Sequence, residues 1–190
     1  MTGLILASQS PQRRKLLRSL RIPFRIVAAN VSEASRETRP GRLVARLALR
    51  KARAVAARHP KALVLGADTI VAHRGQILAK PKSEDDSARI LNTLNGRWHR
   101  VYTGVALIDG RTKKAWSDVT VSRVKARRLP AGEIGRFVGK HMDKAGAYAV
   151  QDRGDPFIER IEGPLDNVIG LPLDGVRRLL RRASRARAAK

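Results

Sequence analysis

Apolar and polar positions along the chain follow two periods, one typical of buried strands and one typical of helices. Eight apolar runs predict β-strands, at residues 4–7, 24–29, 62–71, 76–79, 98–108, 115–125, 145–151 and 157–162. Five segments with helical spacing predict helices, beginning at residues 11, 40, 84, 130 and 173. Strands that alternate with helices, with a hairpin at residues 109–110, indicate an α/β fold with a mixed sheet flanked by helices.

The length of the chain suits one domain with a full core. We therefore expect a single domain over its 190 residues, with a basic C-terminal tail from about residue 181. There are no cysteines, which excludes a disulfide framework and thiolate chemistry. The first residues lack the pattern of a secretory signal, and no apolar run approaches the roughly 20 residues of a membrane span. These features predict a soluble cytoplasmic protein with no membrane partner.

The chain is strongly basic, with 40 Lys and Arg against 16 Asp and Glu, a net charge of +24. Residues 177–190 contain seven of the basic residues and no acidic one, so the net charge without them is still +17 (24 − 7). Such an excess attracts polyanions, including nucleic acid and free nucleotides. The charge is spread over the whole chain, however, and aromatic residues at 4% are too few for base-stacking platforms.

The start of the first helix has an unusual charge. Ser10 is a good N-cap and Pro11 is well placed at the first helical position. The free N–H groups and the helix dipole there favour a bound anion, yet Arg13 and Arg14 stand where acidic residues are usual. One interpretation is that a phosphate binds at this turn, and the other is that both arginines are solvated. The helix after Ser83, by contrast, begins conventionally with three acidic residues.

Three further residues suggest chemistry, and each has a simpler interpretation. Lys51 lies on or beside the apolar face of the helix from residue 40, where its ammonium either reaches water or enters a cleft. Asp68 interrupts the most apolar run, either as a strand-end aspartate bonded to backbone amides or as a general base or metal ligand. Lys80 precedes a proline and, taken alone, is typical of a surface residue.

The chain lacks the strong motifs of other nucleotide and metal enzymes. It contains no Gly-x-x-x-x-Gly-Lys-Ser/Thr loop, no Gly-x-Gly-x-x-Gly and no His-Glu-x-x-His, and its four histidines do not have metal-ligand spacing. Catalysis would therefore depend on carboxylates, lysines and arginines. Such a set suits phosphoryl or nucleotidyl transfer, in which positioning and charge neutralisation supply most of the catalysis.

Taken together, eight stretches in this order resemble the Maf family of nucleoside triphosphate pyrophosphatases. They cover the chain from about residue 4 to 180, and any one of them alone would be a weak signal. The stretches are residues 6–11 with Arg13, then Glu33, 51–52, 66–69, 80–81, 103–107, 143–148 with Gln151, and 167–173. The resemblance implies a strongly twisted mixed sheet of the Maf and inosine triphosphatase type. It also implies a cytoplasmic homodimer that hydrolyses nucleoside triphosphates to the monophosphate and pyrophosphate with a divalent cation, Mg²⁺ or Mn²⁺.

The resemblance also implies roles for individual residues. Asp68 is the expected base, with Lys51 and Lys80 as further catalytic residues. Residues expected at the substrate phosphates are Ser8, Ser10, Arg13 and Glu33. Glu33 and Asp68 are the expected metal ligands. In this scheme the cations bind the triphosphate, Asp68 or the metal ion activates a water that attacks the α-phosphorus, and pyrophosphate leaves.

Two subgroups of the family differ at three positions, which here hold Gln12, Thr69 and Gln151. The type that acts on dTTP and UTP is similar to this chain at Thr69 and Gln151 but has arginine in place of Gln12. The type that acts on 7-methyl-GTP has tryptophan, glutamine and glutamate at these places. An amide at position 151 can bond both the N3–H donor and the carbonyl acceptors of uracil or thymine, whereas a carboxylate suits the two donors of guanine. We therefore expect dTTP or UTP as substrate, with other or modified nucleotides still open.

The alternatives are a basic nucleic-acid-binding protein without nucleotide hydrolysis, a Maf-like enzyme of the 7-methyl-GTP type, and a phosphatase that cleaves another bond. The first predicts binding to long polyanions that weakens steeply with salt and leaves triphosphates intact. The basic surface and tail allow non-specific polyanion binding under every alternative.

Overall fold

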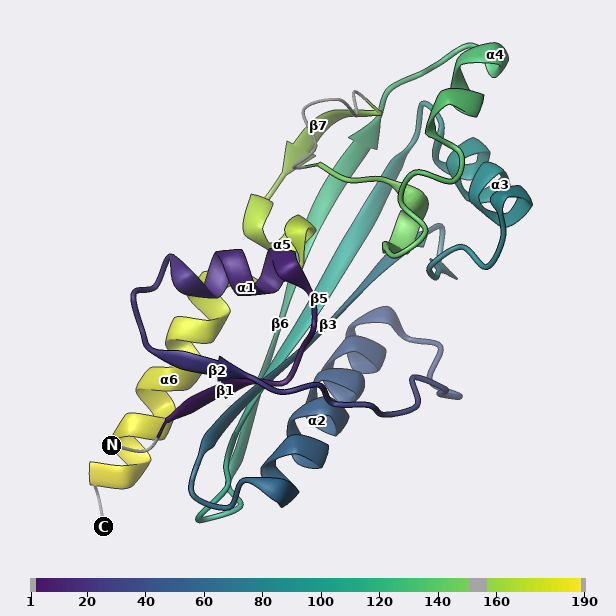
Figure 1. Cartoon of the computed structure of the whole chain (residues 1–190). Helices are drawn as coiled ribbons and strands as arrows, with labels where there is room; N and C mark the ends of the chain where they lie inside the picture. The colour runs from purple at the N-terminus through teal and green to yellow at the C-terminus, as the bar shows by residue number, and fades with distance from the viewer. Residues whose placement is uncertain (1–2, 151–156, 189–190) are drawn as a thin grey trace.

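One seven-stranded sheet runs through the molecule in the computed structural model, which describes residues 3–150 and 157–188. Its strands are β1 (Leu4–Leu6), β2 (Phe24–Ile26), β3 (Leu63–His73), β4 (Gln76–Leu78), β5 (Trp98–Asp109), β6 (Ala115–Ala126) and β7 (Ile158–Glu162). The order is β2-β1-β3-β5-β6-β7, with β4 beside β3. β1 pairs in parallel with β2 and β3, and the other pairings are antiparallel. The predicted mixed sheet is confirmed, and Figure 1 shows the twist of its long strands.

Helices cover both faces of this sheet. They are α1 (Pro11–Arg18), α2 (Pro40–Arg58), α3 (Glu84–Leu94), α4 (Ala131–Ile134), α5 (Leu165–Ile169) and α6 (Leu173–Ala188), with 3-10 turns η1 (Gly135–Phe137) and η2 (Ala145–Ala147). A Cβ on Gly104 of β5 would lie 2.5 Å from the backbone of Val44 in α2, so the sheet and α2 are in close contact there. The next residue, Val105, packs with Leu179 of α6. Because successive strand residues face opposite sides, α2 and α6 cover opposite faces.

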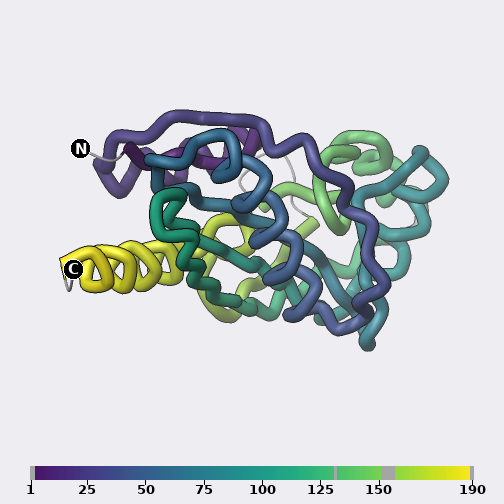
Figure 2. The backbone as a smooth tube through the Cα atoms, turned by 90° about the horizontal axis from the view of Figure 1, so that it is seen from below, coloured from purple at the N-terminus to yellow at the C-terminus, as the bar shows by residue number. Residues whose placement is uncertain are grey.

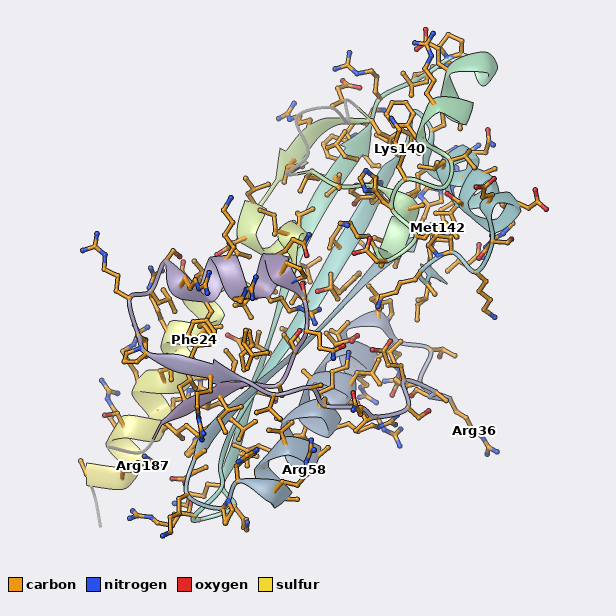
Figure 3. The ribbon with its side chains drawn as sticks, in the orientation of Figure 1. Phe24, Arg36, Arg58, Lys140, Met142 and Arg187 are labelled. Atoms are coloured by element: carbon orange, nitrogen blue, oxygen red, sulfur yellow. The ribbon has the colours of Figure 1, made fainter. Side chains whose placement is uncertain are left out.

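Helix α1 lies on the same face as α6. Leu17 of α1 is fully buried in the cluster that contains Leu179, and Phe24 packs against that cluster. Figure 3 shows Phe24 between α1 and α6. The apolar stripe predicted for the first helix therefore attaches α1 to the sheet, and its N-terminal end is left free to border a cleft.

A second core covers the far end of the long strands. There Leu91 of α3, Phe137 of η1 and Tyr148, which directly follows η2, pack around the fully buried Phe157. The Phe137 and Phe157 rings lie 5.8 Å apart. In Figure 1 this part of the molecule lies at the opposite end from the chain termini.

The part of the chain that follows β6 differs most from the sequence prediction. The strand expected at residues 145–151 is wrong for its described part, because Gly146 and Ala147 have φ angles of 82° and 59°, which a strand cannot contain. A Cβ at residue 146 would also lie 2.8 Å from the Tyr148 ring. The helix expected from residue 130 is limited to α4 and η1, and α5 was not predicted at all.

The most apolar run forms one continuous strand, and this strand includes residues 66–69, where the apolar character of the sequence is interrupted. β5 pairs with β3 through every one of these residues. Gly66 fits because α2 crosses there so closely that a Cβ would collide with the Ala48 carbonyl. The break in apolarity thus marks a helix crossing and places Asp68 inside a strand.

Helix α6 continues to Ala188, so residues 181–188 are helical and part of the packed structure. Ala183 is fully buried, and Arg187 Nε donates to Asp109 Oδ2 at 2.7 Å. Figure 2 shows α6 running along one side of the molecule, and Figure 3 shows Arg187 at its far end. Within residues 3–150 and 157–188, no helix combines the length and apolar character that a membrane span requires.

Candidate active site

A cleft of about 520 Å³ opens at the N-terminal end of α1. Its walls come from residues 7–13, 29–33 and 143–150 and from α5, and its floor includes Lys51 of α2 and Thr69 of β3. These elements meet around the middle of the long strands in Figure 1. Segments far apart in the sequence therefore line one cleft, whose surface is part polar and part apolar.

Lys51 joins two carboxylates at the bottom of this cleft. Its Nζ lies 2.6 Å from Glu33 Oε1 and 2.6 Å from Asp68 Oδ1. The Lys51 side chain is only 12% exposed, so its ammonium is directed into the protein rather than to bulk water. Of the two sequence interpretations of Lys51, the ammonium in a cleft is confirmed.

Asp68 is nearly buried and has one hydrogen-bond donor among the described residues, the Lys51 ammonium. No backbone amide in that part of the chain bonds its carboxylate, so the interpretation as a strand-end aspartate bonded to amides is wrong. Burial raises the pKa of Asp68, and the nearby charges of Lys51 and Arg13 only partly oppose this. A carboxylate with raised proton affinity beside a cleft is suited to act as a general base.

Glu33 lies in the irregular segment between β2 and α2, and its side chain is about half exposed. Partial burial acts to raise its pKa, but the hydrogen bond from Lys51 and the positive charges of Lys51 and Lys80 outweigh this. The pKa of Glu33 is therefore lowered. The two carboxylates on one ammonium thus differ: Glu33 stays ionised, while Asp68 accepts a proton more easily.

Arg13 enters the protein interior instead of extending into solvent. Its Nε donates to the Gly170 carbonyl at 2.9 Å. Its Nη1 donates to the Ala67 carbonyl at 2.9 Å and to Ser8 Oγ at 3.4 Å, and its Nη2 donates to Thr69 Oγ1 at 3.0 Å. Burial lowers the pKa of Arg13, although the acidic groups nearby act in the opposite direction. Protein acceptors thus hold the guanidinium at the edge of the cleft.

The turn before α1 is ordered by side-chain hydroxyls. Ser10 Oγ accepts from the Arg13 backbone N–H at 3.4 Å, which confirms the predicted N-cap. The same hydroxyl donates to Gln12 Oε1 at 3.2 Å, and Ser8 Oγ accepts from the Ser10 N–H at 3.2 Å. Arg14 is exposed, so the two arginines of this turn have different surroundings.

One known family matches nearly the whole chain that forms this site. The family model described as Maf-like protein covers residues 3–183. The chain belongs to the Maf-like protein family.

Relatives that are named for an activity are similar to this chain over nearly their full length. A dTTP/UTP pyrophosphatase of Elusimicrobium minutum is 47% identical over 171 residues, which is 90% of this chain and 93% of the relative. A protein of the same name from Deinococcus radiodurans is 45% identical over 94% of this chain and 92% of the relative. Another from Symbiobacterium thermophilum is 47% identical over 91% of this chain and 90% of the relative.

The structure of this Maf-like protein brings most of the sequence-predicted residues to one place. The cleft is lined by Ser8, Ser10, Gln12, Arg13, Glu33, Lys51, Thr69 and Lys80. Asp68 lies just beneath that lining, bonded to Lys51. Gln151 lies outside the described residues. Lys144 also lines the cleft, with its Nζ 2.7 Å from Asp143 Oδ1.

Sequence reasoning gave no role to several buried polar residues behind the cleft. Thr103 and Asn167 are fully buried and bonded to one another. His99 Nε2 lies 2.8 Å from the hydroxyl of Tyr148, whose residue lines the cleft. Burial lowers the pKa of His99 to about 4, so the imidazole is neutral near pH 7. Thr103 and Asn167 fall in stretches that resemble the Maf family, but nothing in their spacing shows that they meet.

The donor set is compatible with a hard divalent cation. Within the described part of the chain, no group of three or more His, Cys, Asp or Glu side chains could hold a metal ion. The carboxylates of Glu33 and Asp68 nevertheless lie close together, because both contact the same Lys51 ammonium. Mg²⁺ commonly binds through one or two carboxylates together with substrate phosphates, and Mn²⁺ favours the same oxygen ligands. The residues present therefore fit a cation that arrives with a triphosphate.

Proposed function

We propose that this protein hydrolyses dTTP and UTP to the nucleoside monophosphate and pyrophosphate. The observation that carries the proposal is the pairing of Asp68 and Glu33 on Lys51 at the floor of a cleft bordered by a helix N-terminus. Relatives at 45–47% identity that are named dTTP/UTP pyrophosphatase support the same reaction. The anion-binding setting at the start of α1 suits a triphosphate.

The side chains have complementary roles in the proposed reaction. Lys51, Lys80 and the remaining donor capacity of Arg13 bind and orient the phosphates, and Ser8 and Ser10 order the turn against which these lie. Asp68 takes a proton from a water whose oxygen bonds to the α-phosphorus. The bond from that phosphorus to the bridging oxygen breaks, and the electron pair leaves with pyrophosphate. Positioning and charge neutralisation then supply most of the rate enhancement.

Glu33 and Asp68 would hold the divalent cation, Mg²⁺ or Mn²⁺. When bound, such a cation neutralises phosphate charge and orients the triphosphate. Glu33 suits the ligand role, because its lowered pKa keeps it ionised. The Lys51 ammonium keeps the two carboxylates together before the nucleotide arrives.

Base preference is assigned to Gln12, Thr69 and Gln151. Gln12 and Thr69 line the cleft, which supports their inclusion. The amide of Gln151 would bond the donor and acceptor edge of uracil or thymine. The departure at Gln12 from the arginine of the pyrimidine type leaves the ranking of dTTP, UTP and modified nucleotides to experiment.

The proposal also includes a cytoplasmic homodimer with a surface that attracts polyanions. The polyanion-attracting surface is supported by exposed arginines on α1 and α6, among them Arg14, Arg18, Arg181 and Arg185. Retention on duplex DNA that falls steeply with salt, and a solution mass twice that of the 21.0 kDa chain, are the expected results. A monomeric mass would contradict the homodimer, and DNA retention that does not change with salt would contradict the polyanion-attracting surface.

The decisive assay is incubation with a panel of nucleotides in Mg²⁺ or Mn²⁺, with separate quantification of pyrophosphate and orthophosphate. We expect pyrophosphate as first product, highest kcat/KM for dTTP or UTP, and loss of turnover in excess chelator. A first product of orthophosphate would exclude the proposed reaction. Intact nucleotides together with tight binding to duplex nucleic acid would favour the non-enzymatic alternative.

A further inference from the structure

A chain of hydroxyl groups runs from the cleft into the core, and the direction of every hydrogen bond in it is fixed. Arg13 Nη2 lies 3.0 Å from Thr69 Oγ1, which lies 3.0 Å from Thr103 Oγ1. Thr103 Oγ1 in turn lies 2.8 Å from the main-chain carbonyl oxygen of Asn167. A guanidinium can only donate, and a carbonyl oxygen can only accept.

These two ends determine the hydroxyl protons between them. The Thr103 hydroxyl has one proton, and it donates this proton to the main-chain carbonyl of Asn167. The hydrogen bond between the two threonine hydroxyls must therefore use the hydroxyl proton of Thr69. Thr69 therefore accepts from Arg13 and donates to Thr103. Its proton is committed inside the protein, and it has none to offer to a bound base.

Helix α5 holds the inner end of the chain in place. The Asn167 side-chain amide donates to the Val101 carbonyl at 3.1 Å and to Ser122 Oγ at 2.9 Å. Gly170, at the C-terminal end of the same helix, provides the carbonyl that accepts from Arg13 Nε. Thr103 is fully buried between these groups. Arg13 is thus held by α5 twice, directly at Nε and through the two threonines at Nη2.

We propose that Thr103 is a positioning residue for nucleotide binding, acting through Thr69 on the guanidinium of Arg13. This inference rests on the proposed function. It also gives Thr69 a specific way to influence substrate choice, by setting the position of Arg13 rather than by donating to the base. A guanidinium held by oriented acceptors before the substrate arrives binds phosphate without reordering cost.

The test compares Thr103→Val, which keeps the shape and removes the hydroxyl, with Thr103→Ser, which keeps the hydroxyl. In Thr103→Val the Thr69 proton loses its acceptor, and the acceptor geometry for Arg13 is no longer fixed. We expect KM for UTP to rise about tenfold with kcat within about threefold of the unmodified protein. Thr103→Ser should return KM to within about twofold.

Ser87→Ala is the matched control, because Ser87 is another fully buried hydroxyl but lies in α3, bonded to the Gly139 N–H. Partial unfolding lowers the amount of active protein and so lowers apparent kcat while KM stays unchanged. A Thr103→Val protein with normal KM, or a Thr103→Ser protein as impaired as Thr103→Val, would overturn the positioning role.

A parallel measurement separates this inference from the proposed reaction. The Kd of a non-hydrolysable UTP analogue with an imido group between the α and β phosphorus is measured for each variant by calorimetry. We expect the Kd of the analogue to rise about tenfold in Thr103→Val and to return to within about twofold in Thr103→Ser. If the unmodified protein binds the analogue but hydrolyses no nucleotide, the proposed function fails, and the Kd values alone decide the role of Thr103. A protein that does neither overturns both.

Discussion

Two aspartates of this protein, Asp68 and Asp109, both expose little surface and are each bonded to one basic side chain, yet their proton affinities shift in opposite directions. Asp68 is 5% exposed and Asp109 is 1% exposed. Burial raises the pKa of Asp68, whereas the hydrogen bond from Arg187 is the main cause that lowers the pKa of Asp109 to about 2. A small exposed surface alone therefore does not decide the protonation chemistry of a carboxylate.

The difference lies in how deeply each carboxylate is buried within the protein and in the number of donors that it receives. Asp109 accepts from Arg187 Nε at 2.7 Å and from the backbone N–H groups of Arg111 and Thr112 at 2.9 and 3.4 Å. Asp68 accepts from Lys51 alone among the described residues, and Lys51 is shared with Glu33. A carboxylate with all its donors is stabilised as an anion, whereas one with a single shared donor keeps affinity for a proton.

The two aspartates also occupy different places in the fold. Asp109 ends β5 at the hairpin and is joined to the last helix, far from the cleft. Asp68 lies within β3, directly beneath the cleft lining. We interpret the first as a structural ion pair and the second as the base of the proposed reaction.

Asp68→Asn should produce the largest effect on activity. The amide keeps the shape but cannot take a proton, so turnover should fall by roughly 10² to 10⁴-fold. Folding should be little affected, because Lys51 retains Glu33 as a partner. Pyrophosphate release under saturating UTP and a thermal melt measure the two properties. Unchanged turnover with a lowered melting temperature would make Asp68 structural as well.

Arg187→Ala should produce the largest effect on stability and leave activity unchanged. It leaves Asp109 buried without its charged partner, which should cost about 1.5–3 kcal/mol of unfolding free energy. Arg185→Ala, at an exposed position of the same helix, is the control and should cost less than about 0.5 kcal/mol. Denaturant unfolding measures both variants. Equal stability of the two variants would show that the ion pair contributes nothing.

The two aspartates should also respond to pH in opposite ways. The folded pKa of Asp109 lies below its ordinary value of 3.8, so its ionised form stabilises the fold fully above that pH. The contribution is lost as the pH falls from about 4 towards 2, where Arg187→Ala and the unmodified protein should become equally stable. Melting curves of both proteins over this range, at constant ionic strength, provide the check.

For Asp68 the raised pKa has the reverse consequence. Its ionised form is disfavoured in the folded protein, so ionising it costs stability as the pH rises through the raised pKa. The reaction needs that ionised form, and kcat/KM should therefore fall on the acid side at a higher pH than an ordinary aspartate would give. A pH profile of pyrophosphate release without this acid limb would contradict the base role.

Gln12→Arg should give the smallest effect, because it adds a cation beside the cleft and removes only the 3.2 Å hydrogen bond from Ser10 Oγ to Gln12 Oε1. KM for UTP should fall about two- to fivefold, as expected for a partly exposed ion pair. The added charge should also move the acid limb of the pH profile to lower pH, since it favours ionised Asp68. Steady-state kinetics measures both. A rise in KM would exclude position 12 from the phosphate side of the cleft.

The sequence was informative where interactions are local. Helical spacing placed Lys51 on the inward face of α2, the Ser10 cap was read from neighbouring residues, and the long hairpin of β5 and β6 followed from two apolar runs around a turn. The order of the strands and the pairing of β3 with β5 could not be predicted in this way.

Contacts between distant residues explain what the sequence could not provide. Arg13 bonds the carbonyl of Gly170, which lies 157 positions away, and Arg187 bonds Asp109 across 78 positions. The basic end of the chain was therefore predicted as a tail, although α6 packs it against the sheet. Local propensity also favours a strand at residues 145–150, but the chain turns there and Ala147 has a positive φ.

The most direct test of the central claim is the fate of solvent oxygen in one turnover. UTP is hydrolysed in ¹⁸O-labelled water, and UMP, pyrophosphate and orthophosphate are analysed by mass spectrometry. Attack by an Asp68-activated water on the α-phosphorus places one ¹⁸O in UMP and none in pyrophosphate. Label in pyrophosphate or in orthophosphate would show attack at another phosphorus and would contradict the account.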